Sequence, residues 1–262
     1  MKKETIYHII ITFSSIVTVL MIWQLIATLN PTNIIPTPLE LLEALGIIIF
    51  QGDNFGYNIF HHIGASLLRV IIGFFYASII AIPLGLIMGL SKKAEWAASP
   101  IIEIFRPIPP FAWIPFALVL FGLGLISQSF VIFIGAFFPI LTSSYNGVKQ
   151  TLPIHVDVAK TLGANQGEIL AYVIIPSALP SILVGLRIGI GVGWMCVIAA
   201  ELVGLNVPLG LGYLIQYSAQ FGNFGLTLAS MFITGLVGFG MTYSLKLFEN
   251  HALRWREQLG KN

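Results

Sequence analysis

Charge and cysteine are scarce in this chain of 262 residues. Only 9% of the residues are charged, whereas a soluble domain carries about 25%, so an ordinary soluble domain is excluded. The formal net charge of +2 is too small to indicate a nucleic-acid partner. The single cysteine, Cys196, lies in an apolar run, which excludes a disulfide within the chain and a cysteine-based metal site.

Long apolar runs are abundant instead, with 56% hydrophobic residues and a mean hydropathy of +0.90. A bilayer core needs about 20 apolar residues per helix, and backbone exposed to lipid must be helical. The first run is too long for a signal peptide, so we interpret it as a retained helix. The sequence therefore predicts an all-α, polytopic transmembrane bundle with about six spans, over residues 7–29, 64–90, 101–122, 126–146, 181–204 and 226–248.

Lysine and arginine fall on one side of this predicted topology. They cluster at the N-terminus, after the second and fourth spans and at the C-terminus, whereas loops 30–63 and 205–225 contain neither. Because cytoplasmic loops carry an excess of basic residues, we predict a multi-pass protein of the inner (cytoplasmic) membrane with both termini in the cytoplasm. Arg69 departs from this rule, and we expect its side chain to snorkel to the interface.

The predicted topology divides the chain into four segments. Residues 1–30 form a transmembrane helix, and residues 31–63 form an external loop with an interfacial helix from Leu39 to Phe50. Residues 64–248 form the core, which includes a long cytoplasmic loop at 147–180, and residues 249–262 form a cytoplasmic tail.

Prolines are concentrated near the start of the third predicted span, in the stretch Arg106-Pro107-Ile108-Pro109-Pro110. Proline cannot continue a regular helix, so the helix must break here. A broken helix at membrane depth lines a cavity or is covered by protein. A gate or translocation path is therefore one interpretation, and a simple bend at the cytoplasmic edge is the other.

A few polar and aromatic residues are candidates for a substrate path. The fork of an arginine suits an oxyanion such as nitrate or a sulfonate, which favours Arg106, and snorkelling to the headgroups is the alternative. Glu201 is also a candidate for bracing an outer gate. The full set of path candidates is Arg106, Pro109, Trp113, Trp194 and Glu201. No metal site is predicted, because neighbouring His61 and His62 point about 100° apart on a helix.

Glycines recur at every fourth position in two spans, at Gly85 and Gly89 and at Gly185, Gly189 and Gly193. This spacing places small residues on one helix face and allows close backbone contact. Two interpretations of these glycine faces are open: they pack against other helices of the same chain, or they contact a second copy of the chain.

Residues 147–180 predict two short helices. Pro153 suits the first turn of one, and Asn165 with Glu168 forms a capping box for the other. We expect Pro176 and Pro180 to end the second helix and begin the fifth span. The chain has no P-loop, so an ATP-driven mechanism requires a partner, and a short amphipathic helix can lie in a groove of that partner.

This segment resembles the EAA loop of binding-protein-dependent ABC importer permeases. The family pattern is EAA, three residues, Gly, nine residues and I-x-L-P. The chain has Asp157-Val158-Ala159, then Gly163, then Val173-Ile174-Ile175-Pro176 at the same spacings, with Asp in place of Glu and Val in place of Ala. The resemblance implies that the ATPase-coupling residues are Asp157, Ala159, Gly163, Ala164, Val173, Ile175 and Pro176.

Further stretches, at 66–74, 83–85, 106–115 and 193–202, extend the resemblance to the nitrate, sulfonate, taurine and bicarbonate branch. It implies a type I ABC importer permease, which is a transport subunit rather than an enzyme and binds no cofactor itself. The implied partners are two cytoplasmic ATP-binding subunits, a second permease copy in a homodimer, membrane lipid and an external protein that delivers a small anion or organic solute. The alternative is a secondary transporter or channel that acts without an ATPase.

Overall fold

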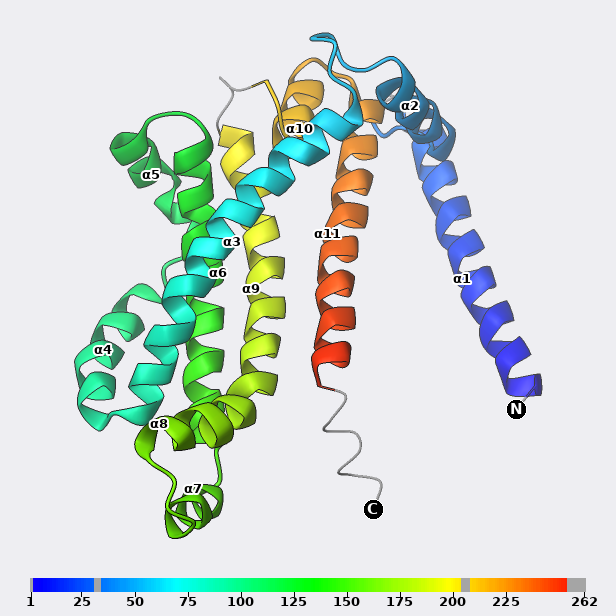
Figure 1. The fold of residues 1–262 in the computed structure, drawn as a ribbon. Coiled ribbons are helices and arrows are strands. Elements are labelled where there is room, and N and C mark those ends of the chain that lie inside the picture. The colour runs from blue at the N-terminus through cyan, green and yellow to red at the C-terminus, as the bar shows by residue number, and fades with distance from the viewer. Residues whose placement is uncertain (1, 31–33, 204–207, 254–262) are drawn as a thin grey trace.

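The computed structural model describes residues 2–30, 34–203 and 208–253, and these parts of the chain contain helices and no strand (Figure 1). The order is α1 (Lys2–Leu29), α2 (Pro38–Phe50), α3 (Ile59–Leu90), α4 (Lys92–Phe105), the 3₁₀ turn η1 (Pro110–Trp113), α5 (Ile114–Phe121), α6 (Leu125–Lys149), α7 (Pro153–Thr161), α8 (Gln166–Ile169), the π-turn η2 (Leu170–Ile174), α9 (Ile175–Val203), α10 (Leu211–Gln220) and α11 (Phe224–Ala252).

Five described helices are long and apolar enough to cross a membrane, and a sixth span is formed if the bent pair of α4 and η1–α5 counts as one. The break that the prolines predict in the third span, 101–122, is confirmed, but the apolar pair begins earlier than the predicted span. The α4 helix begins at Lys92, and the chain turns by 86° between Phe105 and Pro110. The four residues of the break include two of the prolines, which explains why the helix ends here.

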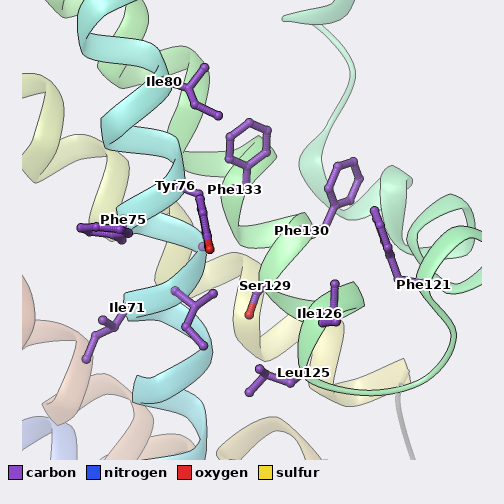
Figure 2. A pocket seen from close by; sticks show the side chains of 12 residues that line it. Ile71, Phe75, Tyr76, Ile80, Phe121, Leu125, Ile126, Ser129, Phe130 and Phe133 are labelled. Carbon is purple, nitrogen blue, oxygen red and sulfur yellow. The ribbon is translucent and has the colours of Figure 1, made fainter.

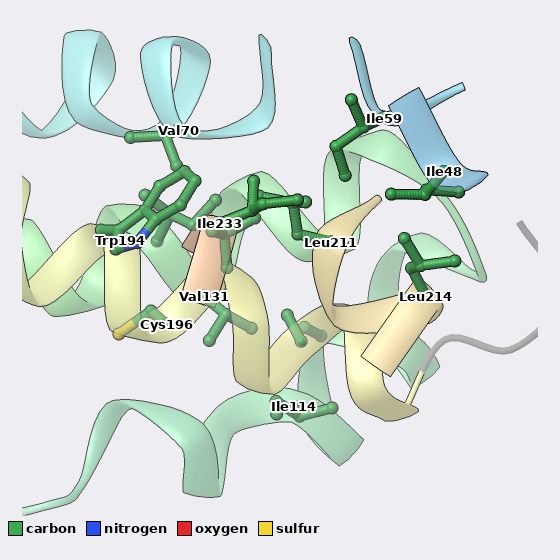
Figure 3. Packing of buried hydrophobic residues seen from close by; sticks show 14 residues of the cluster. Ile48, Ile59, Val70, Ile114, Val131, Trp194, Cys196, Leu211, Leu214 and Ile233 are labelled. Atoms are coloured by element: carbon green, nitrogen blue, oxygen red, sulfur yellow. The ribbon is translucent and has the colours of Figure 1, made fainter. Parts of the chain in front are cut away.

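Helices α3, α6 and α9 pack side by side as the centre of the fold. Glycines permit this close packing: a Cβ on Gly85 would lie 2.7 Å from the Leu141 carbonyl oxygen, and one on Gly189 would lie 2.8 Å from Ile140 Cγ1. Both of these glycine faces therefore serve contacts within the chain. Side chains from α2, α3, α5, α6, α9, α10 and α11 complete the core, among them Trp194 and Leu211 (Figure 3).

The bundle has two distinct ends. One end, which we call the α10 end, carries α2 and α10, and the opposite end, which we call the α7 end, carries α7 and α8 (Figure 1). Helix α1 begins and α11 ends on the side of the α7 end. Residues 205–225 were predicted as a loop without a helix, but they contain α10.

Helix α1 stands apart from the other long helices and approaches α2. Trp23 Nε1 donates a hydrogen bond to the Pro36 carbonyl oxygen at 3.0 Å. Large apolar side chains such as Ile11, Phe13 and Met21 are exposed along α1. Such a surface is suited to lipid or to another membrane helix rather than to water.

Candidate functional site

The segment from α7 to α8 projects beyond the α7 end and forms a compact turn, which we call the handle (residues 150–169; Figure 1). Pro153 occupies the first turn of α7, as predicted. At the other end of α7, the Ala164 N–H donates to the Ala159 carbonyl at 3.0 Å, and the Gly163 N–H donates to the Lys160 carbonyl at 2.9 Å. This pair of bonds is a Schellman motif, which requires a left-handed residue that is most often glycine, and Gly163 has φ +87°.

The spacing of Ala159, Gly163 and Ala164 resembles the family pattern, and it has a local physical reason. The three residues form the hydrogen-bonded turn that ends α7. Asn165 then caps α8: its side chain accepts from the Glu168 N–H at 3.0 Å, and Glu168 accepts from the Asn165 N–H at 2.7 Å. The predicted capping box is confirmed.

The prediction that Pro176 and Pro180 end the second helix is wrong. The chain continues through the π-turn η2 into α9, so that Gln166–Val203 is one span of 38 residues. The wider turn of a π-helix shifts the hydrogen-bond register, which accommodates Pro176 immediately after it. Val173 and Ile175 lie in this same transition, and it joins the handle directly to the central helix α9.

The base of the handle is anchored in the bundle. Val148, Ala178 and Ile182 form a buried cluster with Ile174 packed against it. A Cβ on Gly147 would lie 2.9 Å from the Ala178 carbonyl oxygen, so α6 and α9 are in backbone contact here. The base of the handle is therefore packed directly against α6 and α9.

The tip of the handle exposes apolar side chains. Leu162 is 82% exposed, and Leu152, Ile154 and Val158 are also exposed. Asp157 lies on the same helix with its carboxylate 3.6 Å from Lys160 Nζ, and both side chains face solvent. An exposed apolar patch with charged neighbours marks a protein interaction surface.

A second feature is a groove of about 350 Å³ beside the break between α4 and α5. Arg106 lines it, together with Thr142 and Ser143 from α6 and Ile188 and Val192 from α9. Within the described residues, the Arg106 guanidinium forms no ion pair. A free guanidinium beside two hydroxyl side chains can bind an anionic group.

The other predicted path residues lie in different places. Pro109 is exposed in the break, and Trp113 packs between Phe105 and Phe116 at centroid distances of 5.9 and 5.8 Å. Trp194 is buried, and its Nε1 donates to the Thr234 carbonyl at 3.1 Å. Glu201 is buried at the α10 end. The roles of these residues in a path stay predictions.

An apolar pocket of about 740 Å³ does not contain the candidate residues. It lies between α3 and α6 beside the end of α5, and Phe121, Phe130 and Phe133 line it together with Tyr76 and Ser129 (Figure 2). Its lining is almost entirely apolar, so we do not assign it to a polar solute.

Glu201 and Arg69 form a buried ion pair, with Glu201 Oε1 2.8 Å from Arg69 Nη1 and with exposed fractions of 1% and 4%. The prediction that Arg69 snorkels to the interface is wrong, because Glu201 compensates its charge inside the bundle. The Glu201 carboxylate also accepts from Ser66 Oγ at 2.8 Å and from the Gly212 N–H at 2.8 Å.

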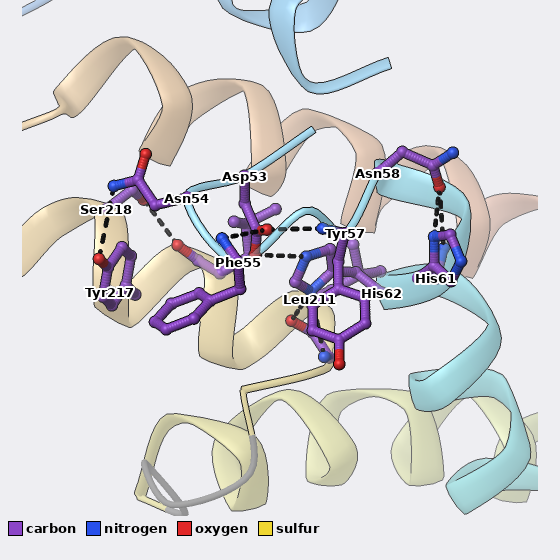
Figure 4. A network of polar contacts seen from close by, with 12 residues as sticks. Asp53, Asn54, Phe55, Tyr57, Asn58, His61, His62, Leu211, Tyr217 and Ser218 are labelled. Carbon is purple, nitrogen blue, oxygen red and sulfur yellow. Dashed lines mark hydrogen bonds and ion pairs between the residues drawn. The ribbon is translucent and has the colours of Figure 1, made fainter. Parts of the chain in front are cut away.

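His62 extends this set of contacts toward the surface (Figure 4). His62 Nδ1 lies 3.2 Å from the Gly210 nitrogen and 3.1 Å from the Gly210 carbonyl oxygen, and Nε2 faces Asp53 Oδ2 at 3.3 Å. We call Asp53, His62, Ser66, Arg69 and Glu201 the α10-end cluster. Burial raises the pKa of the nearby Tyr213 hydroxyl.

A bundle of apolar helices with an anchored, projecting handle defines the chain as a membrane transport subunit. The family described as "binding-protein-dependent transport system inner membrane component" matches residues 81–254. A putative ABC transporter permease protein of Methanocaldococcus jannaschii is 40% identical over 239 residues, which make up 91% of this chain and 89% of that protein. The taurine transport system permease protein TauC of Escherichia coli is 32% identical over 254 residues, or 96% and 92% of the two chains.

A chain of the inward-facing MetNI methionine ABC transporter has a similar fold, with a TM-score of 0.58 and 22% identity over 74% of this chain and 93% of that one. The protein therefore belongs to the family of inner-membrane components of binding-protein-dependent transport systems, as a permease subunit of an ABC importer. The predicted fold class and the predicted branch of the family are confirmed. Membership implies an ATP-binding partner and a solute-binding protein.

Proposed function

We propose that two copies of this chain form the translocation path of an importer driven by two separate ATP-binding subunits, which hydrolyse the ATP. In this arrangement the α7 end and both termini lie in the cytoplasm, and the α10 end receives a solute-binding protein outside the inner membrane. The observation that supports this best is the handle, because it is exposed and apolar at its tip and continuous with α9 at its base.

The handle has the shape and chemistry of a docking element. A short helix with exposed apolar side chains fits a groove of a partner, and burial of a leucine contributes about 1.5–3 kcal/mol. The distribution of basic residues supports the orientation, because Lys149 precedes the handle and Lys160 lies within it, whereas 30–63 and 205–225 lack lysine and arginine.

The solute that we propose is a small oxyanion, such as a sulfonate or bicarbonate. Arg106 has no ion-pair partner within the described residues, and it shares its groove with the hydroxyls of Thr142 and Ser143. An arginine offers paired hydrogen bonds to such an anion. The names of the relatives, which include a taurine permease, point to the same chemical class.

Co-purification and vesicle transport test the proposal. An affinity-tagged chain is expected to bring a P-loop ATPase from the membrane. Right-side-out vesicles with trapped ATP are expected to take up radiolabelled taurine, and inside-out vesicles serve as the control that does not. Asp157→Lys is expected to weaken ATPase binding, while Glu43→Lys, an exposed acid at the α10 end, leaves it intact. Uptake that persists without ATP would support a secondary transporter or channel instead.

A further inference from the structure

The α10-end cluster joins four separate parts of the chain at one place inside the bundle. His62, Ser66 and Arg69 come from α3, and Glu201 comes from the end of α9. The backbone of Leu209–Gly212, which leads into α10, bonds to the cluster: Arg69 Nη2 donates to the Leu209 carbonyl at 3.0 Å, and the Leu211 N–H donates to Ser66 Oγ at 2.9 Å.

The fourth part is a tight turn at residues 53–57, on the surface of the α10 end (Figure 4). Asp53 Oδ1 accepts from the Phe55 and Tyr57 N–H groups at 2.9 and 2.8 Å, while Oδ2 faces His62. The Asp53 side chain is 3% exposed, whereas Asn54 at the tip of the turn is exposed. The cluster therefore connects an exposed turn to the buried end of α9.

The contact between Glu201 and Leu209–Gly212 is unusually close. Gly210 has φ +135°, and a Cβ there would lie 2.5 Å from Glu201 Cδ. Any other residue would push this segment away from the carboxylate. Glycine thus permits the backbone N–H groups to reach Glu201 and His62, and the segment is held against α9 by directional bonds as well as by apolar packing.

At its other end the same helix is continuous with the handle. Gln166–Val203 is a continuous helical stretch of 38 residues, in which α8 and η2 cross the base of the bundle and α9 runs from there to the α10 end (Figure 1). Helix α9 alone has 29 residues, or about 44 Å at about 1.5 Å per residue. That length exceeds the hydrocarbon core of about 30 Å. One uninterrupted element therefore extends from the handle to the α10-end cluster.

We propose that the α10-end cluster fixes the turn 53–57 and the segment 209–212 to α9, so that α9 carries movement between the handle and these two segments at the α10 end. Arg69, Glu201, His62 and Asp53 are positioning residues in this mechanism, because they act on the outer loops and not on the solute. The inference rests on the proposed function, since it requires an ATPase at the handle.

Spin-label distances between the two copies of the complex test this transmission. In a Cys196→Ala background, one sample carries Gln166→Cys at the handle and another carries Asn54→Cys on the turn, and both positions are exposed. The complex with its ATPase is measured without nucleotide and with ATP and vanadate. The distance is expected to shift at both positions.

In Arg69→Met/Glu201→Met the buried charges are removed together, which avoids leaving one of them unpaired. The shift at Gln166 is expected to keep its wild-type size, and the shift at Asn54 is expected to be lost. If the double variant does not assemble, Asp53→Ala provides the second test, because it removes both the acceptor that holds the turn and the carboxylate that faces His62, and it leaves the Arg69–Glu201 ion pair in place.

The matched control is Arg187→Met/Glu249→Met, which removes another ion pair of α9, at 2.9 Å, that does not reach the outer loops. This control is expected to keep both shifts. Shifts of wild-type size at both positions in the cluster variants would overturn the inference. The absence of any shift at Gln166 in the wild-type chain would instead contradict the proposed function.

Discussion

Substitution of Gly163 separates the effect of the handle on ATPase binding from the stability of the bundle. Gly163 has φ +87°, and a Cβ there would meet no atom within 4 Å. Gly163→Ala therefore introduces no clash with a neighbour, and its whole effect is the cost of a left-handed backbone for an L-residue, about 1–2 kcal/mol. That cost acts on the Schellman turn, whose two hydrogen bonds bring Ala164 back to α7.

A cost of about 1–2 kcal/mol lowers the population of the closed turn by up to about 5- to 30-fold. If the ATPase binds only the closed turn, its apparent affinity for the permease falls by the same factor. A Cβ at position 163 meets no atom of the bundle, so the thermal unfolding midpoint of the bundle is expected to change little. The assay is an affinity measurement between the isolated ATPase and the permease in nanodiscs.

Gly222 supplies a matched control, because it also has a positive φ, +73°, and open space around its Cβ position, but it lies at the α10 end. Gly222→Ala is expected to leave ATPase affinity unchanged. Gly163→Asn is expected to fall between wild type and Gly163→Ala, since asparagine tolerates this conformation better than alanine does. Equal losses for Gly163→Ala and Gly222→Ala would refute the reasoning.

Three further predictions concern the rest of the chain. Leu162→Ala is expected to weaken ATPase binding by about tenfold, the equivalent of about 1.4 kcal/mol, without loss of folded protein in size-exclusion chromatography. Glu201→Gln is expected to destabilise the bundle by about 3–5 kcal/mol, because it leaves a buried guanidinium uncompensated, and retention of the wild-type thermal midpoint would contradict this. Gly189→Val is expected to cost about 1–3 kcal/mol by overpacking α6, while Gly240→Ala, which meets no atom within 4 Å, is expected to be neutral or stabilising in the same thermal scan.

The sequence was sufficient to predict the elements that depend on local chemistry. Apolar runs predicted the spans, Pro153 predicted the start of α7, and Asn165 with Glu168 predicted the capping box of α8. Helix caps are formed by residues within a few positions of one another, and this is why their geometry can be predicted from sequence alone.

The contacts that depend on distant residues were not predicted. Arg69 and Glu201 are 132 positions apart, and no feature of either residue's neighbours in sequence indicates the pairing. The continuity through Pro176 was missed because the π-turn before it depends on packing of the handle base rather than on proline itself.

The claim on which this account most depends is that the handle is held by a separate ATPase. A photo-cross-linking residue in place of Leu162, activated in intact cells, measures this contact directly. The account predicts one major product that contains this chain and a P-loop ATPase, and it predicts no such product when the cross-linker replaces Phe55, which is exposed at the α10 end. Cross-links from position 162 to lipid alone, or to a protein on the external side of the membrane, would contradict it.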